Sequence, residues 1–596
     1  MGLPLRAVLI NFIHMQKIKW ILLTVIYLSV YEAGYTQGFL SASGTKIVNA
    51  RGENVLLRGI GLGGWMLQEG YMLRLNGHNP QYSIRNKIAQ LVGVERMEQF
   101  YNDWRKNFIT KADIDSLRAW GFNSVRLPMH YKLYTLPVEQ EPDSAAQTWL
   151  KTGFEMTDSL LSWCKANQLY LILDLHAAPG GQGNDVNISD RDSTQPSLWQ
   201  SPAAQLKTIA LWRKLAERYR DEPAIGAYDI LNEPNWGFED PADRNGLKES
   251  QNKPLRDLLI RITDAIRSAD KQHIIIIEGN GWGNNYRGVF PLWDSNMVIS
   301  YHKYWNTNTQ ESIRHILEAR EQQHAPVWLG ETGENSNTWF AEAIRLLEEA
   351  NIGWSWWPLK KMGSNNPLEI YSNKGYDKLL DYWNHKTVTP PSADTVEQAL
   401  AELAAATHIR NNRIATDVID ALFRQPFSAA ALPYTRHWVR SGELVIPAVQ
   451  YDLGCNRVAY LDKDTGNYSN GKGPRSTGNR GRCFRNDGVD IYKDPDAPGS
   501  FYVGDMENEE WLQYTIEVNK TGSYSISMLG LAHKPGATLA LELDGKVIAG
   551  DILLASDWAK SGSVSVKLKT GKHVVRVLVK QEGGWFKSLH IHGRPG

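Results

Sequence analysis

The sequence predicts an α/β fold, a (β/α)8 TIM barrel followed by a C-terminal β-sandwich of the jelly-roll type. Between Val55 and Trp357, eight short apolar runs alternate with helical or loop segments, which is typical of parallel strands closed into a barrel. From about Glu443 onward, glycine-rich segments separate runs in which apolar and polar residues alternate, which is typical of a β-sandwich. The length of 596 residues accommodates both units.

The predicted barrel strands are apolar runs bounded by polar or turn residues. They cover residues 55–59, 124–127, 170–175, 227–231, 273–277, 297–301, 327–330 and 353–356. Helical periodicity between them predicts helices that include 113–120, 159–167, 205–220 and 255–269. This alternation is what predicts parallel rather than antiparallel barrel strands.

A helical extension is predicted between the barrel and the sandwich. Pro390 and Pro391 interrupt the chain, and alanine-rich helices are expected over 395–406 and 413–423. The predicted organisation is therefore a signal peptide at 1–37, the barrel at 38–385, the helical extension at 386–440 and the sandwich at 441–596.

The N-terminus predicts export. Lys17 and Lys19 precede the apolar run 20–31, which is short for a membrane span and is followed by small and polar residues. We interpret this as a signal peptide with Met15 as the true start, and a membrane anchor is the alternative interpretation. The expected location is secreted, periplasmic or cell-surface, without stable membrane insertion.

Composition indicates a neutral partner. The 65 basic and 65 acidic residues balance, so nothing favours nucleic acid or an anionic membrane. The 22 Trp and 25 Tyr supply flat rings of the kind that stack on sugars. Of three cysteines, Cys455 and Cys483 are the candidate disulfide pair, whereas Cys164 falls in a helical pattern and is expected to be a buried thiol. We expect a monomer.

Two glutamates stand out because each follows a short apolar strand. Glu233 follows the predicted fourth strand, and Glu331 follows the seventh. The C-terminal ends of parallel barrel strands share one mouth, so the two carboxyls are expected to face each other there. A pair of carboxyls is what glycoside hydrolysis requires. No cluster of His, Cys and Asp with metal-ligand spacing lies near them, so no catalytic metal is predicted.

Six short motifs, in order along the chain, resemble glycoside hydrolase family 5, the cellulase family, over residues 40–385. They are residues 121–128 (GFNSVRLP), 173–176 (LDLH), 232–234 (NEP), 301–304 (YHKY), 330–331 (GE) and Trp357. The resemblance implies a retaining double displacement in which Glu233 is the acid/base and Glu331 the nucleophile. It also implies substrate-binding or orienting roles for Arg126, His176, Asn232, His302, Tyr304 and Trp357.

Residues 62–69 and 176–182 resemble the exo-β-1,3-glucanase branch of that family more than the endocellulases. In that branch the residue matching Glu69 binds the terminal glucose at the non-reducing end. The polar segment 185–196 does not match, so linkage and exo or endo attack stay open.

The C-terminal segment resembles a family 6 carbohydrate-binding module over residues 454–467, 485–491 and 504–515. This implies that Phe484 and Trp585 stack on sugar. Structural calcium is left open, because the usual acidic residue is absent around Ala448. The module is expected to tether the enzyme to insoluble glucan. Cutting the chain near Glu443 is therefore expected to leave activity on short soluble oligosaccharides nearly intact.

Together, these features predict a secreted retaining β-glycosidase that hydrolyses a β-glucan polysaccharide or oligosaccharide and needs no cofactor for catalysis. The alternatives are a β-mannanase or another β-glycosidase of the same family, or a catalytically silent glycan-binding surface protein.

Overall fold

The computed structural model describes residues 37–143, 146–440, 442–466 and 478–593. The predicted signal peptide lies outside the described residues except for Gln37. Among the residues that are described, no helix combines the length and the apolar character needed to cross a bilayer.

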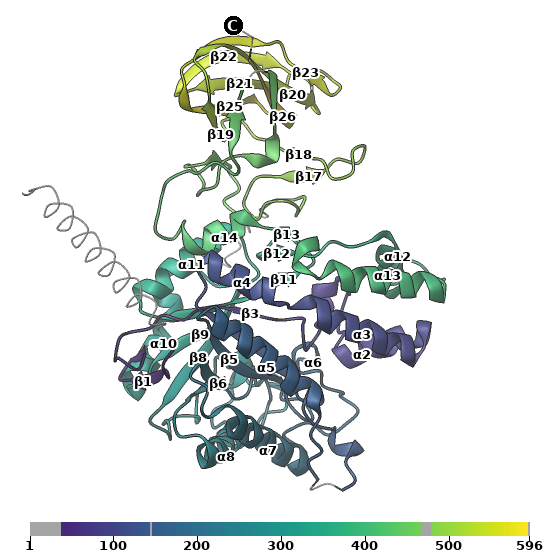
Figure 1. Ribbon diagram of the computed structural model, residues 1–596, viewed down its shortest axis with the longest axis vertical. Coiled ribbons are helices and arrows are strands. Elements are labelled where there is room, and N and C mark those ends of the chain that lie inside the picture. Colours follow the sequence, from purple (N-terminus) through teal and green to yellow (C-terminus); the bar gives the residue numbers. More distant parts are fainter. Residues whose placement is uncertain (1–36, 144–145, 441, 467–477, 594–596) are drawn as a thin grey trace, which may run out of the picture. The chain divides into compact units, whose positions relative to one another are not determined.

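Eight parallel strands close into a barrel, as predicted, in the order β10-β3-β4-β5-β6-β7-β8-β9 (Figure 1). They are β3 (Arg58–Gly61), β4 (Ser124–His130), β5 (Tyr170–Ala177), β6 (Ile225–Asp229), β7 (Ile274–Glu278), β8 (Met297–Lys303), β9 (Val327–Gly333) and β10 (Gly353–Trp357). Strand β7 has four isoleucines before Glu278 and is buried at every position, as expected for a parallel strand covered on both faces. Strand β6 ends at Asp229, so Glu233 lies in the loop beyond it and not at the end of a longer strand.

Helices surround the barrel and continue into the extension. They are α2 (Gln81–Val92), α3 (Val94–Phe108), α4 (Lys111–Trp120), α5 (Lys151–Ala166), α6 (Val186–Ser189), α7 (Pro202–Tyr219), α8 (Lys253–Ala269), α9 (Asn280–Gly283), α10 (Gln310–Gln323), α11 (Asn337–Glu349), α12 (Lys374–Trp383), α13 (Ala393–Ala406) and α14 (Thr416–Phe423). Side-chain caps explain several starts: Ser392 accepts from the Thr395 amide at the start of α13, and Ser336 accepts from the Trp339 amide at the start of α11.

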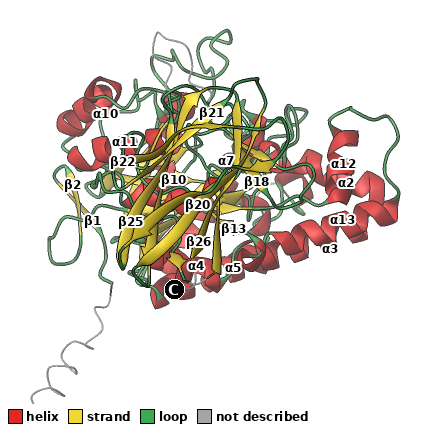
Figure 2. Cartoon of the chain, turned by 90° about the horizontal axis from the view of Figure 1, so that it is seen from above, coloured by secondary structure: helices red, strands yellow, loops and turns green. Residues whose placement is uncertain are grey.

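The two helices of the extension pack on different parts of the barrel's helical layer. Helix α13 lies beside α3, and Figure 2 shows the two running side by side. Helix α14 packs against α11, which follows β9. Short strands β11 (Lys360–Lys361), β12 (Leu368–Glu369) and β13 (Arg413–Ile414) form a small sheet that joins the end of the barrel to this extension. A hairpin of β1 (Ser41–Ser43) and β2 (Lys46–Val48) precedes the barrel.

The C-terminal segment forms two sheets of mostly antiparallel strands, which confirms the predicted β-sandwich (Figure 1). One sheet has β14 (His437–Val439), β16 (Tyr460–Leu461), β19 (Trp511–Val518), β21 (Thr538–Leu543), β22 (Lys546–Leu553) and β25 (Gly571–Gln581). The other has β15 (Gly442–Pro447), β17 (Ile491–Lys493), β18 (Phe501–Val503), β20 (Gly522–Ala532), β23 (Ala559–Lys560), β24 (Val564–Leu568) and β26 (Gly584–Gly593). Apolar side chains from both sheets, including Tyr514, Val577, Ile526 and Leu589, form its core.

The cysteines are free thiols in the described structure. Cys164 is buried in α5, as expected. The candidate disulfide is not formed: the Cys483 thiol donates to the carbonyl of Ile491 at 3.1 Å, and Cys455 donates to Gln425 Oε1 at 3.6 Å.

Candidate active site

A cavity of about 570 Å³ opens where the barrel strands end at their C-terminal side. Strand-end and loop residues from most of the barrel line it: Glu69, Tyr71, His176, Asp185, Asn187, Ile188, Glu233, Trp282, Asn284, His302, Tyr304, Trp305, Glu331, Glu334 and Trp357. Seven of the residues singled out from the sequence of the barrel are in this lining. The other two, Arg126 and Asn232, are fully buried; Arg126 donates to Glu331 and to Asn232.

Glu233 and Glu331 face each other across this cavity. One carboxylate oxygen of each and a ring nitrogen of His302 lie within 4.8 Å of one another. His302 Nδ1 is 2.5 Å from Glu233 Oε1 and 3.7 Å from Glu331 Oε2. Retaining glycosidases hold their carboxyls about 5 to 5.5 Å apart, whereas inverting enzymes hold them about 6.5 to 9.5 Å apart. The spacing therefore fits the retaining geometry.

Glu233 occupies an unusual backbone conformation that the site supports. Its φ is 43°, which is uncommon for a residue with a Cβ, and its amide donates to Glu278 Oε2 at 2.7 Å. Burial raises the pKa of Glu233 to about 7; His302 acts against this, and the charges of Glu331 and Glu278 add to it. A carboxyl with this pKa can hold a proton near neutral pH and release it, as an acid/base must.

Glu331 accepts two hydrogen bonds that fix its carboxylate. One comes from Nη1 of the buried Arg126, and the other comes from the Tyr304 hydroxyl at 2.9 Å. Burial, with the charge of Glu331 as a further cause, raises the pKa of Tyr304 well above its usual range. Tyr304 therefore keeps its proton and remains a donor to Glu331.

Arg126 lies at the centre of a group of buried carboxylates that the sequence analysis did not anticipate. Its guanidinium contacts Asp229 at 2.8 Å, Glu278 at 3.1 Å and Asp174 at 3.2 Å, in addition to Glu331. It also donates to Asn232 Oδ1 at 2.8 Å. Four carboxylates around one cation explain why Arg126 stays charged although it is fully buried.

Glu278 is the most informative of the missed residues. It bridges the site, since Oε2 accepts from the Glu233 amide and Oε1 lies 3.1 Å from Arg126 and 3.3 Å from His302 Nε2. The sequence did contain a signal for it, because four isoleucines from Ile274 to Ile277 end in this glutamate. The same pattern of apolar strand and carboxylate marks Glu331.

The remaining predicted barrel residues form one wall of the cavity. His176 stacks on the Trp357 indole, with ring centroids 5.1 Å apart and planes 8° apart, and its Nδ1 is 2.7 Å from Asp174. Burial lowers the pKa of His176 to about 3, so its ring is neutral at ordinary pH. Burial, followed by the charges of Glu331 and Glu334, raises the pKa of Glu69 well above its usual range. A protonated Glu69 can both donate to and accept from a sugar hydroxyl.

Two groups of described side chains also lie close enough to hold a metal ion: Asp174, His176 and Glu331, and Glu233, His302 and Glu331. Sequence spacing did not reveal these groups, because their members come from different strands. Both groups also lie beside positive charge within the protein, from Arg126 and from His302, whose pKa the surrounding carboxylates raise well above its usual range against the effect of burial.

In the sandwich, the structure places Phe484 and Trp585 in different surroundings. Phe484 packs against Phe501 and Tyr434, at 5.0 and 5.6 Å between centroids, with the Arg413 guanidinium 5.5 Å from its ring. Trp585 belongs to a separate set of partly exposed rings, which we call the aromatic platform. The platform consists of Tyr492, Tyr502, His533, Trp558 and Trp585.

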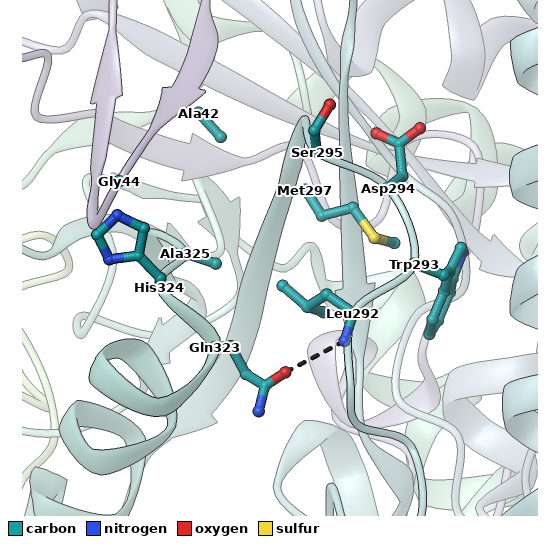
Figure 3. Close-up of a pocket in the computed structure, with 10 residues that line it drawn as sticks. All are labelled: Ala42, Gly44, Leu292, Trp293, Asp294, Ser295, Met297, Gln323, His324 and Ala325. Carbon is teal, nitrogen blue, oxygen red and sulfur yellow. Dashed lines mark hydrogen bonds between the residues drawn. The ribbon is translucent and has the colours of Figure 1, made fainter.

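A second cavity, of about 370 Å³, lies at the other end of the barrel (Figure 3). It is lined by the turn of the first hairpin and by the segments that lead into β8 and β9, where Gln323 accepts from the Leu292 amide at 3.1 Å. Its acidic lining residue, Asp294, is paired with Arg267 at 2.8 Å. This cavity is remote from the carboxyl pair and offers no comparable chemistry.

Comparison with known proteins agrees with the geometry. Residues 84–363 match the family model Cellulase (glycosyl hydrolase family 5). A β-xylosidase of Phanerodontia chrysosporium is 33% identical over 252 residues, which are 42% of this chain and 48% of that protein. Endoglucanase C of Acetivibrio thermocellus is 24% identical over 341 residues, 47% of this chain and 91% of that protein. A probable glucan 1,3-beta-glucosidase A of Aspergillus clavatus is 27% identical over 255 residues, 42% of this chain and 56% of that protein.

The chain thus spans about half the length of the β-xylosidase that it matches. The family match covers β4 with Arg126, the loop after β6 with Glu233, and β9 with Glu331. The resemblance drawn from the sequence is confirmed over this segment: residues 84–363 form a glycosyl hydrolase family 5 domain.

Proposed function

We propose that the protein is a secreted, retaining β-glycosidase that hydrolyses β-glucosidic bonds of a glucan. The observation that carries this proposal is the pair of carboxyls, Glu233 and Glu331, with oxygens within 4.8 Å of each other in a cavity of about 570 Å³. The unequal surroundings of the two groups support unequal roles. Glu331 accepts from Arg126 and Tyr304, whereas burial and neighbouring carboxylates raise the pKa of Glu233 to about 7.

In the first step, a Glu331 oxygen attacks the anomeric carbon, and the bond from that carbon to the leaving oxygen breaks as Glu233 gives the leaving oxygen its proton. In the second step, a water attacks the same carbon, Glu233 takes the water's proton, and Glu331 leaves as a carboxylate. The charge of Glu331 is one of the causes that raise the pKa of Glu233. Its loss in the covalent intermediate lowers that pKa, which makes Glu233 a base when the second step needs one.

The wall formed by Glu69, His176 and Trp357 supports recognition of a single sugar next to the nucleophile. His176 Nε2 lies 3.9 Å from Glu69 and 3.4 Å from Asn232 Nδ2, so the polar ends of these side chains converge. Convergent polar groups beside an aromatic ring match the mixed polar and apolar surface of a pyranose.

The aromatic platform supports a second function, carbohydrate binding by the sandwich. Trp585 stacks on His533 at 4.5 Å and on Tyr502 at 4.9 Å, and Tyr502 stacks on Tyr492 at 5.6 Å. A row of partly exposed rings offers a surface to which a sugar chain can bind by stacking. We place polysaccharide binding at this platform; Phe484 is also partly exposed, but it packs against Phe501 and Tyr434 and is not part of the platform.

The test of the proposed function is product analysis with a panel of β-1,3, β-1,4, β-1,6 and mixed-linkage glucans, together with a β-mannan and aryl β-glucosides and β-xylosides. The xylosides belong in the panel because one relative is a β-xylosidase. Release of glucose or glucooligosaccharides with retained β-configuration is the expected result. Turnover of mannan or xyloside alone would reassign the substrate, and no turnover of any member would favour a glycan-binding protein.

A further inference from the structure

We propose that the C-terminal sandwich completes the active site by positioning the nucleophile side of the barrel through Asn486, and so is not a separable tether. This inference rests on the proposed glycosidase function. It replaces the expectation, drawn from the sequence, that a chain cut near Glu443 keeps nearly intact activity on short soluble oligosaccharides.

Asn486 contacts the loop that follows the nucleophile strand. We call residues Glu334, Asn335 and Ser336, between β9 and α11, the nucleophile loop. Asn486 Nδ2 donates to the Asn335 carbonyl at 2.8 Å, and the Asn337 amide donates back to the Asn486 carbonyl at 2.8 Å. The contact therefore begins four residues beyond Glu331.

The helical extension closes this contact from a third side. Asp417, in α14, accepts from the Asn486 amide at 2.9 Å and from Asn337 Nδ2 at 2.8 Å. Asn335, Asn337 and Asp417 are 1%, 3% and 1% exposed, and Asn486 is 7% exposed. Buried polar groups of this kind stabilise one arrangement strongly, because each is costly to leave without its partner.

The nucleophile loop in turn holds the loop that carries Tyr304. Asn335 Nδ2 donates to the Tyr304 carbonyl at 3.2 Å. Two further bonds join the start of α11 to the Tyr304 loop, from Trp339 Nε1 to the Asn306 carbonyl at 2.9 Å and from Asn308 Nδ2 to the Trp339 carbonyl at 3.0 Å. The Tyr304 hydroxyl then donates to Glu331 at 2.9 Å.

A continuous set of contacts thus leads from the sandwich to the nucleophile, through the buried Asn486 and Asn335 and the half-buried Tyr304. The acid/base is held differently, because Glu233 is fixed by His302 and Glu278. Loosening the sandwich contact should therefore disturb the attack by Glu331 while leaving the titration of Glu233 in place. Asn486 is a positioning residue in this sense.

The first test is Asn486→Ala in the full-length chain. With a fluoro-sugar that labels the nucleophile, the inactivation rate constant kinact should fall about tenfold, as expected for one lost hydrogen bond to an aligned group. The inhibition constant Ki, and KM for an aryl β-glycoside, should stay within about twofold of the wild-type values. The alkaline limb of the pH profile, near pH 7 because of Glu233, should not move.

Two further variants separate positioning from loss of stability. Asn335→Asp keeps the size of the side chain but removes the donor to Tyr304, so it should give the same fall in kinact, and combining it with Asn486→Ala should add little more. Arg424→Gln is the matched control, since Arg424 donates to the sandwich at the Leu453 carbonyl at 3.2 Å and otherwise to Asp420 and Ala430. It should lower the melting temperature without changing kinact.

The inference would be overturned if folded Asn486→Ala kept the wild-type kinact, or if the effects of Asn335→Asp and Asn486→Ala on kinact were additive. Neither result would affect the proposed glycosidase function. If the wild type turned over no β-glycoside, the proposed function would fail instead. Hydrogen exchange would then still decide the contact: faster exchange confined to residues 334–339 in Asn486→Ala supports it, and unchanged exchange overturns it.

Discussion

Replacing His302 by alanine should move the alkaline limb of the pH profile upward. Among the influences on Glu233, burial is the largest and raises its pKa, and the charge and hydrogen bond of His302 act in the opposite direction. Without His302, burial and the charges of Glu331 and Glu278 remain. A hydrogen bond between charged groups contributes about 1.5 to 3 kcal/mol, and 1.36 kcal/mol corresponds to one pKa unit. The pKa of Glu233 should therefore rise from about 7 by roughly one to two units.

The assay is kcat/KM for an aryl β-glycoside between pH 4 and pH 10. Activity requires protonated Glu233, so it is lost as the pH rises through the pKa of this group, and a higher pKa shifts the loss to higher pH. His176→Ala is the control: burial lowers the pKa of His176 to about 3, so its removal takes away no positive charge in this range. A limb that stays in place or moves downward in His302→Ala would refute the assignment of the limb to Glu233.

Three other changes test separate parts of the account. Glu233→Ala should slow substrates with poor leaving groups far more than activated aryl glycosides, and azide should restore turnover with a β-linked azide product; an α-linked product would show inversion. Trp585→Ala should weaken binding to insoluble glucan in a pull-down while the melting temperature stays unchanged, because the ring lies outside the sandwich core; unchanged binding would contradict the platform. Burial, followed by the charge of Glu510, raises the pKa of Asp462 to about 9, so the folded state holds a proton that the unfolded state releases above about pH 4. The melting temperature of the sandwich should therefore fall between pH 5 and pH 8 in the wild type and fall less in Asp462→Asn. Millimolar calcium should reverse the fall if the carboxylates of Asp462 and Glu510 bind the ion. Equal dependence of the melting temperature on pH in the two proteins would contradict the pKa shift.

The sequence predicted the barrel and its carboxyl pair because both depend on local patterns. A parallel strand covered on both faces must be apolar throughout, so each barrel strand is visible as a short hydrophobic run. Glu331 is visible because a charged residue ends such a run. Glu278 follows the same rule after Ile277 but belongs to none of the motifs of the resemblance, which is why it was missed.

Other features depend on contacts between distant segments, which no local pattern encodes. Arg126 gathers Asp174, Asp229 and Glu278 from three other strands, and barrel closure alone brings them together. The contact of Asn486 with Asn335 spans 151 positions of the chain. An asparagine in a loop carries no sequence signal for such a partner, so the link between the sandwich and the nucleophile could be found only in the structure.

The most direct test of the central claim, that Glu331 and Glu233 form a retaining pair, is to identify the residue that becomes covalently bound to the sugar. The enzyme would be incubated with an activated 2-fluoro-β-glucoside, digested and examined by tandem mass spectrometry. The account predicts one fluoroglucosyl group per chain on Glu331, none in Glu331→Gln, and faster accumulation than release. A label on Glu334, which lies in the same cavity but is bound to Lys361, would contradict the assignment of the nucleophile. Turnover of the substrate with inverted configuration and no labelled residue would contradict the retaining mechanism itself.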